Sequence, residues 1–138
     1  MWKIIGFCLI CLFSNSIYGQ NKADLQYVKI GNMEGKLDVV DFNLMGGKTK
    51  YIQFLEEFEK NFSKINNGYP DYYRYYSIMD SSPRKLIIKL IPKSAVSAEN
   101  KKKYYWFIPI NTKTFKVYYN VKTKKVDGII ETSSSIIE

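Results

Sequence analysis

The chain has 138 residues, with 21 lysines and arginines against 13 acidic residues, a net charge of +8, no histidine and two cysteines. This length suits one small domain. The missing histidine excludes a Ser-His-Asp triad and imidazole metal sites, and both cysteines fall in a predicted signal peptide, which leaves the mature chain without a thiol nucleophile.

The first 19 residues have the pattern of a secretory signal peptide. Lys3 precedes an apolar run from Ile4 to Phe13, and Gly19 offers a small residue for cleavage. The run is about half the ~20 residues that a membrane-spanning helix needs. Neither cysteine follows the small residue that a lipoprotein signal requires. We therefore expect a bacterial exported protein, periplasmic or secreted, whose residues 20–138 form one domain.

Two short strands are predicted before the first helix. They cover residues 25–30 and 37–42, with Gly31 and Gly35 marking the turn between them. The following stretch ends in Gly-Lys-Thr, but Phe42 stands where a phosphate-binding loop needs its first glycine. The sequence therefore predicts a glycine loop that leads into a helix capped by Thr49.

The clearest helix signal covers residues 50–66. Large apolar residues recur there at spacings of three and four, which places them on one helical face: Tyr51, Leu55, Phe58, Phe62 and Ile65. Asn66-Asn67-Gly68 is a plausible end. An apolar stripe at this spacing predicts a helix packed on the core of the domain.

Strand patterns dominate the chain after Pro70. They predict five strands and a loose tail at 132–138, the strands covering 72–79, 86–91, 104–110, 115–121 and 126–131. One helix followed by strands in series predicts an α+β fold, in which the helix packs on a four- to five-stranded antiparallel meander. This layout resembles cystatin-like and helix-grip architectures. The resemblance is one of layout alone, because residues 26–30 miss the Q-x-V-x-G loop of cystatins by one place.

The predicted strands carry aromatic residues on both faces, and one helix covers only one face. The other face is therefore expected to form a binding surface of Tyr73, Tyr75, Tyr105, Phe107 and Tyr118. This face is expected to be covered in one of three ways: by the N-terminal segment 21–45, by a partner or second copy of the chain, or by a ligand. Tyrosine suits all three, because its ring stacks and its hydroxyl tolerates water.

A basic end is also predicted. The second half of the chain, residues 81–138, holds 12 basic and 4 acidic residues. In a meander, the loops 92–103 and 122–125 share one end of the sheet and gather Lys93, Lys101, Lys102, Lys103, Lys122, Lys124 and Lys125. Such an end attracts an anionic polymer or membrane surface, although lysines also serve solubility and edge protection.

These patterns favour a non-enzymatic exported domain that binds a protein, peptide or glycan of the envelope or the extracellular space. Self-association through the sheet face and binding of an anionic surface through the basic end are the alternatives. A hydrolase using Asp38 and Asp41, or the glutamates at 56, 57 and 59, is a third hypothesis. No pattern points to a metal or another cofactor.

Overall fold

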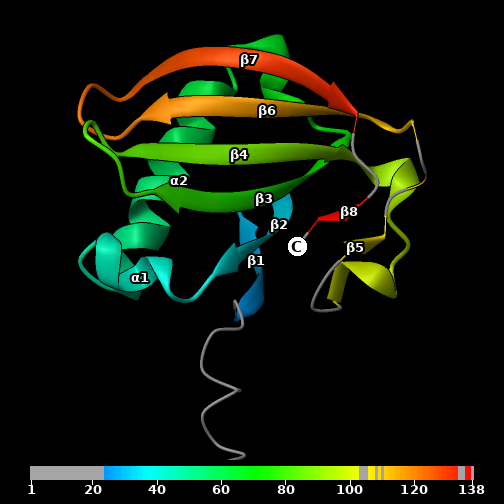
Figure 1. The fold of residues 1–138 in the computed structure, drawn as a ribbon, viewed down its shortest axis with the longest axis horizontal. Coiled ribbons are helices and arrows are strands. Elements are labelled where there is room, and N and C mark those ends of the chain that lie inside the picture. Colours follow the sequence, from blue (N-terminus) through cyan, green and yellow to red (C-terminus); the bar gives the residue numbers. More distant parts are fainter. Residues whose placement is uncertain (1–23, 103–105, 108, 110, 134–135, 138) are drawn as a thin grey trace, which may run out of the picture.

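The fold is a mixed six-stranded sheet with a helix on one face (Figure 1). The computed structural model describes residues 24–102, 106–107, 109, 111–133 and 136–137, so the predicted signal peptide lies outside it. The strand order is β1-β2-β3-β4-β6-β7. The strands span Leu25–Ile30 (β1), Met33–Asp38 (β2), Tyr72–Met79 (β3), Lys85–Pro92 (β4), Lys113–Asn120 (β6) and Lys125–Ser133 (β7).

The sheet is mixed because β2 and β3 are parallel. After β2 the chain forms the short helix α1 (Asp41–Leu44) and the long helix α2 (Lys48–Phe62), which carries it back to start β3 in the same direction as β2. The other pairs of the main sheet are antiparallel. The predicted α+β class is confirmed, whereas a purely antiparallel meander is wrong at this one junction.

Helix α2 begins two residues earlier than expected and ends four residues earlier. Its N-cap is Gly47, with φ 114°, and no side chain caps it, so the predicted Thr49 cap is wrong. A positive φ of this kind is readily available only to glycine. Four of the five residues of the predicted apolar stripe are 0% exposed: Tyr51, Leu55, Phe58 and Phe62. The fifth, Ile65, follows the end of α2 and is only partly buried against the core.

The core lies between α2 and alternate residues of the central strands. Because side chains of a strand alternate between faces, every second residue of β4 and β6 points at the helix. These residues join the stripe of α2 in one buried cluster, to which the strands contribute Leu37, Tyr76, Leu86, Ile88, Leu90, Val117 and Tyr119. This face of the sheet is thus buried against α2.

The predicted strand 104–110 does not enter the main sheet between β4 and β6. Of its described residues, Trp106–Phe107 form a short strand (β5), which pairs with Ile136–Ile137 (β8) in a separate two-stranded sheet. Consequently β4 pairs directly with β6, and the predicted loose tail instead contributes to β7 and β8. This arrangement depends on strand pairing between distant segments. The alternation of apolar and polar residues within one segment does not reveal such pairing.

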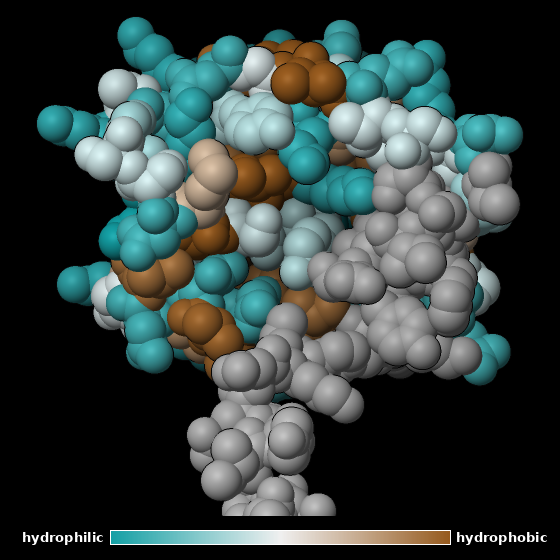
Figure 2. Space-filling view, in the orientation of Figure 1, coloured by the Kyte–Doolittle hydropathy of each residue, from teal (hydrophilic) through white to brown (hydrophobic). Residues whose placement is uncertain are grey.

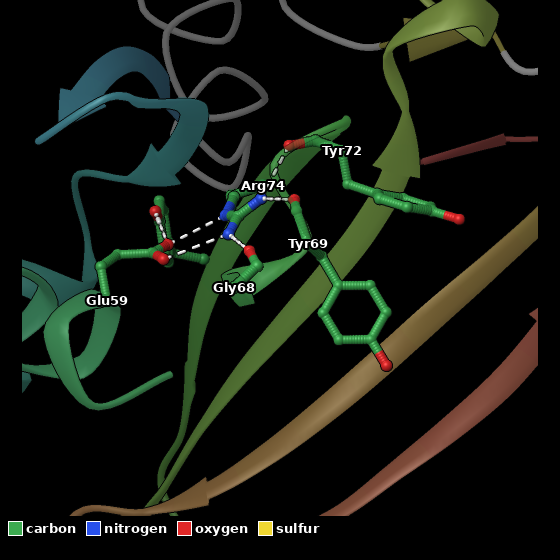
Figure 3. Close-up of polar contacts among 6 residues, drawn as sticks. Glu59, Gly68, Tyr69, Tyr72 and Arg74 are labelled. Atoms are coloured by element: carbon green, nitrogen blue, oxygen red, sulfur yellow. Dashed lines mark hydrogen bonds and ion pairs between the residues drawn. The ribbon is translucent and has the colours of Figure 1, made fainter. Parts of the chain in front are cut away.

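One buried ion pair ties α2 to the sheet (Figure 3). Arg74 of β3 is 0% exposed, and its Nε and Nη2 donate to the Glu59 carboxylate over 2.9 and 3.2 Å. Its other three N–H groups donate to the carbonyl oxygens of Gly68, Tyr69 and Tyr72. All five guanidinium donors are therefore satisfied, which a buried charge requires.

The same site fixes how β2 approaches β3. Gly35 of β2 lies opposite Arg74, and a Cβ atom on it would stand 2.5 Å from the Arg74 carbonyl oxygen and 2.8 Å from its Cβ. Only glycine allows this contact, because any side chain would push the two backbones apart. Gly35 was predicted as part of a turn, but it lies inside β2.

Replacing Glu59 should destabilise the fold strongly. In Glu59→Gln the amide nitrogen would face the donors of Arg74, and the guanidinium would stay buried without its counter-charge, at a cost of about 3 kcal/mol or more. Glu57→Gln is the matched control, because Glu57 pairs with Lys124 on the surface, where such pairs contribute less than about 1 kcal/mol. Urea unfolding of both variants measures the difference, and equal losses would contradict this role for Glu59.

Candidate functional site

The candidate site is the sheet face opposite α2, called the second face below. It is formed by the strand residues that point away from the helix, chiefly Lys36, Tyr73, Tyr75, Ile87, Lys89, Ile91, Lys116 and Tyr118. Figure 2 looks onto this face and shows brown and pale side chains over its middle, with hydrophilic ones around them. Apolar, aromatic and cationic side chains are thus combined on one surface.

The structure brings three of the five predicted aromatic residues together there. Tyr73 and Tyr75 of β3 point away from α2, and Tyr118 of β6 lies on the same face, across from Ile87. Phe107 belongs to β5 and so lies outside the main sheet, and its side chain is not described. Tyr105 lies outside the described residues.

One end of the second face is covered by residues 93–102, here called the 93–102 loop. Val96 of this loop packs with Tyr73 and Ile91, and these three residues are 5%, 7% and 0% exposed. Tyr75 and Tyr118, nearer the other end, are half-buried. Residues 24–45, one of the expected covers, instead extend the edge of the sheet as β1 and β2 and lead through α1.

A polar cluster fastens the 93–102 loop to the β1–β2 hairpin. Lys101 Nζ donates to Glu34 Oε2 over 2.7 Å, and the Tyr27 hydroxyl donates to the same oxygen over 2.5 Å. The bonds from Lys101 and Tyr27 hold the pKa of Glu34 below its ordinary value. At neutral pH the carboxylate is therefore ionised and keeps both donors in place.

The described lysines of the predicted seven-lysine end lie at two opposite ends of the sheet. Lys85 of β4 pairs with Asn120 of β6, so the β6–β7 turn lies at the end of the sheet where β4 begins. Lys122, Lys124 and Lys125 are at that end, whereas Lys93 and Lys101 follow the far end of β4. Lys103 and the side chain of Lys102 are not described. The prediction failed because it counted residues 104–110 as a strand of the sheet.

The structure instead places three other lysines in one line on the second face. Lys36 on β2, Tyr75 on β3, Lys89 on β4 and Lys116 on β6 are successive register partners, and these four residues are called the lysine row. Sequence reasoning missed it because each lysine is an ordinary polar position within its own strand. Only the pairing register aligns them.

The surroundings lower the pKa of two lysines of the row. Lys36 is 2% exposed, and burial lowers its pKa to about 8. Burial also lowers the pKa of Lys89, and the charge of Lys116 lowers it further. Perturbed titratable groups gather at functional sites more often than elsewhere, although structural groups also show such shifts.

Two carboxylates of the hydrolase hypothesis, Glu56 and Glu59 of α2, lie away from the second face. Glu56 and Glu59 line a groove of about 350 Å³ together with Lys60 and residues 30–33 of the β1–β2 turn. Both Glu59 oxygens accept hydrogen bonds from Arg74, and Oε1 also accepts one from Tyr76. This carboxylate is therefore already neutralised within the core.

Two negative findings apply to the described part of the chain. No group of three or more acidic, histidine or cysteine side chains is arranged to hold a metal ion among the described residues. Nor is any helix in that part long and apolar enough to span a membrane.

Comparison of the chain with protein-family models, with curated proteins and with solved structures found no match. The site must therefore be interpreted from its own geometry.

Removing the buried lysine should stabilise the protein. A lysine with a folded pKa of about 8 and an unfolded pKa of about 10.4 binds more protons when unfolded, so its contribution to stability rises as the pH increases between these values. Lys36→Met should therefore gain about 1–3 kcal/mol at pH 7. The difference in unfolding free energy between variant and wild type should shrink from pH 8 to pH 10. A difference that is constant across this range would contradict the shifted pKa.

Proposed function

We propose that this protein is an exported, non-enzymatic domain that binds a protein, peptide or glycan through its second face. The observation that carries the proposal is the grouping of Tyr75, Tyr118 and Ile87 with cationic side chains on the sheet face that α2 does not cover. Such contiguous aromatic and apolar surfaces mark interaction sites more often than isolated exposed residues do.

The way the second face is covered supports this assignment. The 93–102 loop packs over Tyr73 and Ile91 at one end, where β4 finishes and β6 starts. Tyr75 and Tyr118 stay half-buried beyond it, each presenting a ring with a hydroxyl at its tip. Rings of this kind contribute contact area at little entropic cost and tolerate a wet boundary, which suits reversible binding.

Export, expected from residues 1–19, belongs to the same proposal. A domain whose mature chain has neither histidine nor cysteine is poorly equipped for nucleophilic or metal-dependent catalysis. It is well suited to act as a binding module, since binding needs only a rigid surface with the right shape and charge. The sheet supplies that rigidity, because its central strands are paired on both sides.

The test uses the two half-buried tyrosines. Purified protein is titrated calorimetrically against a panel of oligosaccharides, polysaccharides and extended peptides, and Tyr75→Ser and Tyr118→Ser are compared with wild type. Each variant should weaken binding about fivefold, because a lost aromatic contact is worth about 1 kcal/mol.

Val40→Ser is the matched control, because Val40 is an exposed apolar residue, 60% accessible, at the start of α1. It should bind as wild type does. Ligand affinity that is unchanged in both tyrosine variants would remove the second face as the binding surface.

A further inference from the structure

The connection between α2 and β3, called the left-handed turn below, contains successive residues with a left-handed backbone. Asn66, Asn67, Gly68 and Tyr69 have φ values of 45°, 54°, 72° and 51°. This conformation costs free energy for residues other than glycine and persists only where the surrounding structure holds it. Two hydrogen bonds close the turn: the Gly68 N–H donates to the Ile65 carbonyl oxygen over 2.8 Å, and the Tyr69 N–H donates to that of Asn66 over 3.1 Å.

The left-handed turn supports the buried ion pair. The carbonyl oxygens of Gly68 and Tyr69 accept two of the hydrogen bonds that Arg74 donates. The Tyr69 ring also stacks on Phe62 of α2, with 5.5 Å between the ring centroids. A change in the length or direction of this turn would therefore remove acceptors from a guanidinium that is fully buried, and buried donors without acceptors destabilise the fold.

The left-handed turn also contains the only Asn-Gly dipeptide of the sequence, Asn67-Gly68. Asparagine is chemically labile, and it is most labile before glycine, because no side chain shields the next backbone nitrogen. That nitrogen loses its proton to water and attacks the side-chain Cγ atom of the asparagine. An N–Cγ bond forms, the Cγ–Nδ2 bond breaks, and ammonia leaves with a proton returned by water, so that a succinimide ring remains. Water then opens the ring at either carbonyl, which gives aspartate or, with the backbone rerouted through Cγ, isoaspartate.

The folded turn opposes this reaction in two ways. Ring closure requires the Gly68 nitrogen to lie beside the Asn67 side chain, but at the Asn67 ψ of 24° it lies almost opposite the Cβ atom. In addition, Gly68 is buried and its N–H is bonded to Ile65, so the nitrogen keeps its proton. The Asn67 side chain itself is exposed to water. Asn67 is therefore expected to react only when the turn opens locally.

We infer that Asn67 is a latent modification site, which the left-handed turn protects from cyclisation and at which isoaspartate formation releases the turn from Arg74. Isoaspartate adds a methylene carbon to the backbone between positions 67 and 68. A turn of this changed length does not keep both closing hydrogen bonds and both carbonyl contacts to Arg74. Aspartate, the other product, keeps the backbone length and tolerates the left-handed conformation. Only the isoaspartate product should therefore weaken the anchor between α2 and the sheet.

The first experiment measures the rate of deamidation at each asparagine. The protein is incubated at mildly alkaline pH with and without denaturing urea, and the modified peptides are quantified by mass spectrometry. In urea, Asn67 should react fastest of all asparagines. In the folded protein its rate should fall about tenfold or more, because only the locally open fraction reacts.

Asn66 is the internal control for this rate, because it lies in the same turn but precedes another asparagine. It should react more slowly than Asn67 in urea. Equal rates at Asn67 in the folded and the unfolded protein would show that the turn gives no protection and would overturn the inference. A rate at Asn67 in urea no higher than that at Asn66 would overturn it too.

The second experiment measures the consequence for the fold. After incubation in urea and refolding, chains with isoaspartate at position 67 are separated chromatographically from unmodified chains, and the urea midpoints of unfolding are compared. Asn67→Asp is the matched control, because it carries the same charge as the isoaspartate chain on a backbone of unchanged length. The isoaspartate chain should unfold at a clearly lower urea concentration or fail to refold, whereas Asn67→Asp should stay near wild type. Equal midpoints for the isoaspartate chain and Asn67→Asp would contradict the release of Arg74.

Discussion

The buried pair between Arg74 and Glu59 determines how the rest of the molecule is arranged. It joins α2, the connection at residues 66–69 and β3 through a guanidinium whose five donors are all used. A buried ion pair of this type is a poor source of net stability, but it penalises any arrangement that separates its members. In this protein it fixes the rotation of β3 about its own axis.

That rotation settles the composition of both sheet faces. With Arg74 under the helix, Tyr72 and Tyr76 must also point toward α2, and Tyr73 and Tyr75 must point away. A slip of one residue would exchange the two sets and bury a different surface. Because β4 and β6 follow β3 in fixed register, the same constraint brings Lys89 next to Tyr75 and Lys116 next to Lys89. The set of side chains on the second face is therefore determined by how Arg74 is held in the core.

Local patterns predicted much of this fold. The period of the apolar residues identified α2, and alternation identified β3, β4, β6 and β7 to within about two residues. Three features depended on contacts between distant segments and were not predictable in this way. They are the parallel pairing of β2 with β3, the exclusion of Trp106–Phe107 from the main sheet, and the lysine row. Gly35 shows the difficulty well, because a strand glycine required by a close backbone approach looks like a turn glycine in the sequence.

On our proposal, the ligand binds to the second face and not to the basic ends of the sheet. Lysine footprinting is the decisive experiment: the protein is acetylated briefly with and without a saturating concentration of the oligosaccharide, polysaccharide or peptide that binds in the calorimetric panel, and the extent of modification is read by mass spectrometry. We expect the ligand to slow acetylation of Lys89 and Lys116 and to leave acetylation of Lys122 and Lys125 unchanged. Protection of Lys122 and Lys125 with none at Lys89 and Lys116 would contradict it.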